Sequence, residues 1–91
     1  MSQINQLELI WQEVLDIMAS ELAKPSFDAW IKDSRPVHFE GNTLFVELPN
    51  EFTRDWVDAR YAAPLRKTLR HVVNKDWDLK LVIPSNLKPL T

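Results

Sequence analysis

The side chains that most often perform catalysis or bind metal ions are few and scattered in this chain. His38 and His71 lie on different predicted elements, and neither has a metal-ligand neighbour at helical spacing. The only glycine, Gly41, excludes a glycine-rich loop of the kind that holds phosphates or dinucleotides. With no cysteine there is no thiolate metal site. These residues predict neither an enzyme nor a bound cofactor or metal.

Charged side chains are distributed unevenly, although the net charge is only −2. Residues 1–23 contain four acids and no Lys or Arg, whereas residues 59–75 contain five Lys and Arg and no acid. This pattern predicts either two solvated helix faces of opposite sign or two faces that attract each other between copies. A further alternative is contact with the phosphates of a single-stranded nucleic acid. The cations of that alternative are Arg60, Arg66, Lys67 and Arg70.

Length and composition predict one small globular domain, because 45% of the 91 residues are apolar. No segment has the roughly 18 consecutive apolar residues of a membrane span, and the N-terminus lacks the basic start of a signal peptide. We therefore expect a cytoplasmic protein with no membrane partner.

Apolar residues recur at steps of three and four over residues 3–23, which predicts an amphipathic helix. Its apolar stripe is wider than one core contact requires, so we expect Trp11 and Ile10 to lie at its margin, partly exposed. Pro25 ends this helix and begins a second, short helix that runs to Lys32.

Two strands are predicted next, at residues 37–40 and 43–48. The pair Gly41-Asn42 between them is typical of a hairpin turn. Asn50 then has the side chain and the position to cap a new helix.

Pro64 interrupts the helical pattern that follows, and an interior proline costs a helix roughly 3 kcal/mol, so we expect a kink or break there. A last strand is predicted at residues 77–83. The prediction is therefore an α+β domain over residues 1–84, a two-layer sandwich in the order α-α-β-β-α(kinked)-β with helices covering a three-stranded sheet. Residues 85–91 are expected to be a tail or the start of a flexible linker. The expected centre of the core is Trp30, Trp56 and Trp77.

Phe52 is an unusual residue for its position, because it is a large aromatic in the first turn of the helix that Asn50 caps. Its side chain either folds back into the core or is exposed on the surface, where a partner could bind it. Phe52 and Trp11 are both of the residue types found at interface hot spots, although each is also a candidate for the core.

Several motifs resemble the N-terminal domain of DnaA, the family of bacterial initiators of chromosomal replication. They are Trp11-Gln12, Lys24-Pro25-Ser26-Phe27 with Trp30, Asn42-Thr43-Leu44, and Pro49-Asn50-Glu51-Phe52 with Arg54-Asp55-Trp56 and Tyr61. The similarity runs in consistent order from Leu9 to Ile83. It implies a KH-like module that lacks the Gly-x-x-Gly loop, which agrees with the single glycine of this chain.

The resemblance further implies an adaptor rather than an enzyme, one that self-associates weakly, helps to load the replicative helicase and docks regulators of initiation. Weak binding of single-stranded DNA is also implied. Self-association would centre on Trp11, with Ile10 and Val14 beside it. The residues implied for helicase and regulator binding are Phe52, Asn50, Thr53, Ser26 and Asp28.

This chain departs from the family pattern at Ser26, where some relatives carry an acid, which leaves Asp28 as the nearby charge. It also lacks the phosphate loop and the helix-turn-helix that the ATP-binding and duplex-DNA-binding parts of an initiator need. The resemblance thus implies an isolated first domain, with a free-standing homologue as the alternative.

Overall fold

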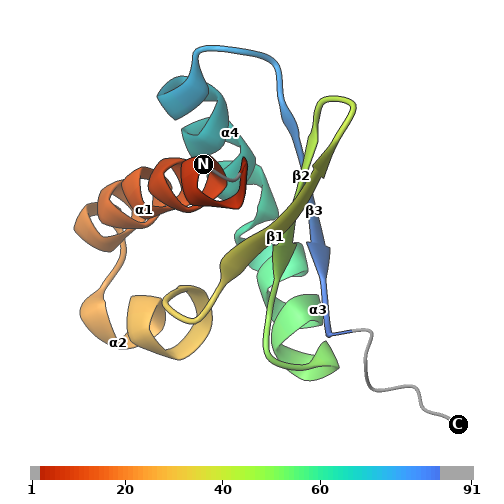
Figure 1. Ribbon diagram of the computed structural model, residues 1–91. Coiled ribbons are helices and arrows are strands. Elements are labelled where there is room, and N and C mark those ends of the chain that lie inside the picture. Colours follow the sequence, from red (N-terminus) through yellow and green to blue (C-terminus); the bar gives the residue numbers. More distant parts are fainter. Residues whose placement is uncertain (1–2, 85–91) are drawn as a thin grey trace, which may run out of the picture.

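Residues 3–84 of the computed structural model form two layers, a three-stranded sheet with helices packed on one face (Figure 1). The elements in chain order are α1 (Gln3–Glu21), α2 (Lys24–Ser26), the π-helix η1 (Phe27–Ile31), β1 (Arg35–Glu40), β2 (Thr43–Glu47), α3 (Glu51–Arg60), α4 (Ala62–Val73) and β3 (Asp78–Val82). This is the predicted α+β fold. The predicted tail, residues 85–91, lies outside the described residues.

The sheet has the order β1-β2-β3, with β2 antiparallel to β1 and parallel to β3. A parallel neighbour needs a crossover connection, and α3 with α4 provides it. In the parallel pair Leu44 lies opposite Leu79, and Val46 lies opposite Leu81. All four are buried, so this face of the sheet carries the core.

The hairpin between β1 and β2 forms as predicted. Gly41 has a φ of 63°, a left-handed conformation that glycine adopts without steric cost. The register of β1 shifts between Pro36 and His38. Pro36 is tolerated because β1 is an edge strand, where a missing N–H donor leaves no ladder bond broken.

The long helix breaks as predicted, but the break lies at Tyr61 rather than at Pro64. Asn50 caps α3, its Oδ1 accepting the Thr53 N–H at 2.8 Å. The ring of Pro64 would collide with the Arg60 carbonyl in a continuous helix. Tyr61, with φ −119° and ψ −3°, therefore ends α3, and Pro64 lies in the first turn of α4, where its missing N–H costs nothing.

Among residues 6–84, thirteen buried apolar residues form the core. The predicted centre of that core, Trp30, Trp56 and Trp77, is not the one that the structure shows. Trp30, Trp56 and Trp77 are all only partly buried, and Trp30 and Trp77 pack against the outside of the core. Trp11 is instead the buried tryptophan, with 1% of its surface exposed. The helix that carries Trp11, α1, packs against α4, β1 and η1, so its inward side lies in the core.

Candidate functional site

Aromatic side chains from two separate elements meet on the surface of this domain. Trp30 of η1 stacks on Trp56 of α3, with ring centroids 4.7 Å apart and planes inclined by 17°. Phe52 lies 5.9 Å from Trp30 on one side, and the Arg60 guanidinium lies 4.1 Å from the Trp56 ring centre on the other. We call Trp30, Phe52, Trp56 and Arg60 the aromatic patch.

Helical spacing brings three members of the aromatic patch together. Phe52, Trp56 and Arg60 follow one another at steps of four, so they lie on one side of α3. The cap at Asn50 begins α3 immediately before Phe52 and thereby sets where that side points. The fourth member, Trp30, comes from the facing η1.

The π-helical turn of η1 positions Trp30. The Lys32 N–H donates to the Phe27 carbonyl five residues earlier, at 2.9 Å. Such wide turns are rare and occur often at functional sites. This turn buries Ile31 in the core while it leaves the neighbouring Trp30 partly exposed against α3.

The exposure of Phe52 distinguishes the aromatic patch from an ordinary cluster of the core. Its side chain is 69% exposed, and it borders a shallow hollow of about 410 Å³. The hollow is lined by Phe52, Asp55, Trp56, Ala59 and Arg60. Within the described part of the chain, the buried indole N–H of Trp56 has no hydrogen-bond acceptor. The patch therefore offers an apolar anchor beside a fixed cation, which suits a protein partner more than a reaction.

The other residues implied for helicase and regulator binding lie on the two elements that meet here. Asn50 is exposed but its Oδ1 is used by the cap, and Thr53 is partly buried in the first turn. Ser26 and Asp28 lie on the α2–η1 segment, where Asp28 pairs with Lys24 at 3.2 Å. The negative charge of Asp28 is therefore already partly neutralised by Lys24 of the same chain.

Sequence reasoning did not group Trp30, Trp56 and Arg60 with Phe52. We predicted Trp30 and Trp56 at the centre of the core, where the structure does not place them, and named Arg60 only in the nucleic-acid alternative, which stays a prediction. The spacing of Phe52, Trp56 and Arg60 on one helix side is a signal that the sequence contains. The approach of Trp30 is a tertiary contact, and no local pattern predicts it.

The expectation that Trp11 lies partly exposed is wrong, and Val14 beside it is fully buried. The Trp11 indole N–H donates to the Ser34 Oγ at 2.9 Å, and that hydroxyl donates to the Ile31 carbonyl at 2.6 Å. Trp11 is thus tied to the end of η1 by a buried hydrogen-bond chain. Burial of this large ring with its N–H satisfied is favoured over exposure. Ile10 is partly buried and remains on the surface.

The cations of the nucleic-acid alternative are mostly occupied by contacts within the chain. Arg66 donates to the Asp78 carboxylate at 2.8 Å and to the Leu79 carbonyl at 3.2 Å. Arg70 donates to the Trp77 carbonyl at 2.9 Å. These two arginines fasten α4 to the start of β3.

The amide of Leu79 and the guanidinium of Arg66 both donate to Asp78, and together they lower the pKa of its carboxyl group. Arg60 lies against Trp56. Within residues 3–84, Lys67 is the one cation of the four with no such contact.

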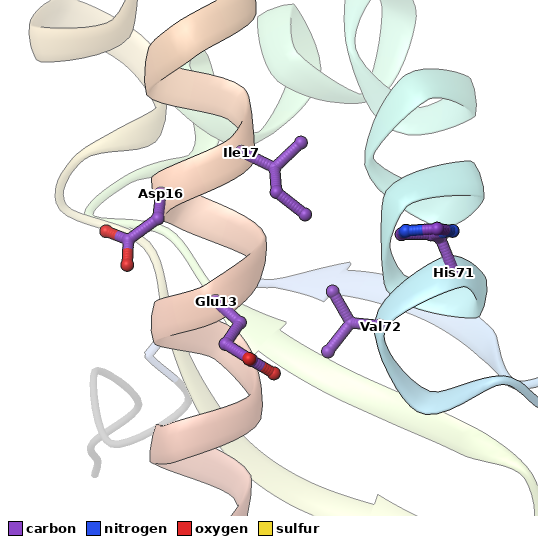
Figure 2. Close-up of a pocket in the computed structure, with 5 residues that line it drawn as sticks. All are labelled: Glu13, Asp16, Ile17, His71 and Val72. Carbon is purple, nitrogen blue, oxygen red and sulfur yellow. The ribbon is translucent and has the colours of Figure 1, made fainter.

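His71 lies near Glu13 and Asp16, where it could suggest a metal site. The three line a hollow between α1 and α4 together with Ile17 and Val72 (Figure 2). Yet no group of three His, Asp or Glu residues within residues 3–84 has the geometry to hold a metal ion. Among those residues there is also no helix long and apolar enough to cross a membrane.

The fold is an α+β domain with a three-stranded mixed sheet, and it carries an exposed aromatic patch where η1 meets α3. Comparison of the chain with models of known protein families identifies the class to which this domain belongs. The chain belongs to the DnaA N-terminal domain family, whose model matches residues 8–71. Membership makes it a non-catalytic interaction domain, as the resemblance implied.

A solved structure confirms the fold independently. A chain in the crystal structure of a HobA–DnaA (domain I–II) complex from Helicobacter pylori matches with a TM-score of 0.70 at 15% sequence identity. The match covers 80% of this chain and 94% of that one. At this identity the likeness establishes the shared fold alone.

Proposed function

We propose that this domain is the interaction module of a chromosomal replication initiator and that it docks the replicative helicase and initiation regulators through the aromatic patch. The observation that carries the proposal is the exposure of Phe52, which is 69% accessible, whereas Val57 of the same helix is fully buried. A large aromatic held in the open is costly to hydrate, and a partner that covers it gains the apolar area.

The surroundings of Phe52 have the anatomy of an interface hot spot. Trp30 and Trp56 support the anchor from behind, so the ring is pre-oriented and loses little entropy on binding. Arg60 provides a cation at the rim, and the Trp56 ring restrains its guanidinium. Trp, Tyr and Arg are the residues that dominate such sites.

The relative's structure supports the regulator part of the proposal. That DnaA chain was crystallised as a complex with HobA. We infer by analogy that this domain also binds a regulator in the cytoplasm. Weak self-association belongs to the same proposal, but its contacts would need side chains other than the buried Trp11 and Val14.

Protein docking is favoured over single-stranded DNA binding for a structural reason. Arg60, Arg66 and Arg70 each contact a group of the chain itself, so they are poorly placed to release counterions at a phosphate backbone.

Chemical-shift mapping with the organism's replicative helicase tests the proposal. Addition of helicase to labelled domain should first perturb the amide signals of Phe52 and its neighbours in α3, together with the indole signals of Trp30 and Trp56. The signals of the outer sheet face, such as those of Phe45, serve as the internal control. Perturbations that spare α3 and η1 would refute the assignment of the site.

A further inference from the structure

Trp30 is the one member of the aromatic patch that does not belong to α3, so the patch is complete only while η1 holds Trp30 against that helix. The Trp30 ring lies 4.7 Å from the Trp56 ring and 5.9 Å from the Phe52 ring, measured between centroids. Phe52 and Trp56 are placed by α3 itself, which Asn50 caps. The contacts that fix η1 therefore decide whether Phe52 has Trp30 beside it.

The π-helix η1 has few local means of keeping its own geometry. It is five residues long, and no side chain caps its N-terminus. Helices this short are unstable by themselves, and the π-helical bonding pattern is rare. A return to α-helical bonding, in which each N–H donates to the carbonyl four residues back rather than five, would turn Trp30 relative to Ile31. Contacts from outside η1 must therefore hold the turn.

Ser34 provides such a contact at the C-terminal end of η1. The last carbonyl of η1, that of Ile31, accepts the Ser34 N–H at 3.0 Å and the Ser34 hydroxyl at 2.6 Å. The same hydroxyl accepts the Trp11 indole N–H at 2.9 Å, which uses its capacity both to donate and to accept. Ser34 and Trp11 are both buried, so water does not compete for these bonds. One hydroxyl thus joins η1 to the inward side of α1.

The connection continues from Ile31 to the aromatic patch. Ile31 is fully buried, and the neighbouring Trp30 is partly buried against α3. Because the two residues are adjacent in one turn, the bonds that fix the Ile31 carbonyl also fix the direction in which Trp30 leaves the backbone. We propose that Ser34 is a positioning residue of the aromatic patch, whose hydroxyl ties η1 to Trp11 and so keeps Trp30 stacked. The inference rests on the proposed function for its effect on binding, whereas the placement of Trp30 is a property of the free domain.

Removal of the hydroxyl tests the proposal first in the unbound 91-residue chain. In Ser34→Ala the NMR signals of the Trp30 and Trp56 indoles and of the Phe52 ring should shift. The near-ultraviolet circular dichroism of the stacked Trp30–Trp56 pair should weaken as well. A hydroxyl that contributed to stability alone would leave these signals in place below the unfolding transition.

Thr68→Val is the matched control. Thr68 is 8% exposed and Ser34 is 6% exposed, and the Thr68 hydroxyl donates to the Met18 sulfur at 3.6 Å, between α4 and α1. The control therefore also removes one buried hydroxyl, but on α4 rather than at the end of η1. Whatever its effect on the melting temperature, the Trp30 and Phe52 signals should stay as in wild type.

Trp11→Phe breaks the same connection at its other end and keeps the test decisive if Ser34→Ala folds poorly. It removes the indole N–H that bonds to Ser34, so it should shift the Trp30 and Phe52 signals in the same direction. The double variant should shift these signals no further than Ser34→Ala alone, because both changes remove one connection. Shifts that simply add would contradict a shared connection.

Helicase affinity then measures the consequence for binding. If Trp30 is stacked in about a tenth of the Ser34→Ala molecules, the apparent affinity falls about tenfold, because only that fraction binds. Thr68→Val should bind as wild type. Unchanged Trp30 and Phe52 signals in Ser34→Ala or Trp11→Phe, or equal shifts in Thr68→Val, would overturn the positioning role whatever the helicase does. Shifted signals with unchanged helicase affinity would keep the positioning role and count against helicase docking at the aromatic patch.

Discussion

Replacement of Phe52 by alanine should separate binding from folding, because the side chain is mostly outside the core. A phenylalanine buries about 200 Å² when it is fully enclosed. With 69% of Phe52 exposed, about a third of that area, roughly 60 Å², is in contact with the domain. At about 25 cal/mol per Å² the loss of folding stability is at most about 1.5 kcal/mol. A fully buried aromatic would cost about 3–5 kcal/mol.

The same substitution should have a much larger effect on the helicase complex. A central aromatic anchor contributes roughly 2 kcal/mol or more, which corresponds to about a thirtyfold loss of affinity. Titration calorimetry of helicase with wild-type and Phe52→Ala domain measures the binding loss, and urea unfolding measures the stability loss. The two numbers together show whether Phe52 acts through the interface or through the fold.

Leu9 provides a matched control for this experiment. It is 71% exposed on α1, so Leu9→Ala removes a large apolar side chain of the same accessibility at a distant surface. We expect its helicase affinity to stay within about twofold of wild type. The reasoning is refuted if Phe52→Ala binds as well as wild type, or if Leu9→Ala loses as much affinity as Phe52→Ala.

Three further predictions follow from the buried and charged contacts. Trp11→Phe should lower the free energy of unfolding by about 1–2 kcal/mol in urea titrations, because it removes the N–H that bonds to Ser34; a negligible loss would contradict the burial of Trp11. Asp78 has a pKa below its ordinary value of 3.8, so its stabilising contribution is complete above that value and is lost as pH falls through the lowered folded pKa. The difference in melting temperature between wild type and Asp78→Asn should therefore shrink as melts are taken from about pH 5 to pH 2, and a constant difference would count against the hydrogen bonds that the Leu79 amide and Arg66 donate to Asp78. A single-stranded oligonucleotide should bind weakly, with a log–log salt slope near −0.7 for one phosphate contact at Lys67, whereas a slope several times steeper would revive the basic-helix alternative.

Local signals in the sequence predicted the elements well. The apolar period of α1, the Asn50 cap and the hairpin at Gly41 are each decided by a few neighbouring residues, and each forms as expected. Pro64 predicted a break in the long helix, and the position of the break follows from the collision of its ring with the preceding turn. The strand order was open, because strand pairing depends on residues far apart in the chain.

The assignment of aromatic residues to core or surface was poorer, for a physical reason. Trp11, Trp30, Trp56 and Trp77 all have the hydrophobicity to enter the core, and the interlayer space admits only one of them fully. Which one enters depends on the packing of α1 against η1 and the sheet, and on the availability of Ser34 as an acceptor. The apolar periodicity of the sequence cannot show which of the four tryptophans is buried.

The sequence by itself therefore determined the helices, the strands, their caps and breaks, and it marked Phe52 as an unusual residue for the first turn of a helix, with burial and exposure both open. Only the tertiary structure decided that Phe52 is exposed beside Trp30 and Trp56, that Arg66 and Arg70 fasten α4 to β3, and that Glu21 and Lys67 line one hollow between α1 and α4. Caps and breaks depend on neighbours within one turn of the chain. A docking surface depends on contacts between η1, α3, α1 and α4, and those exist only after the domain has folded.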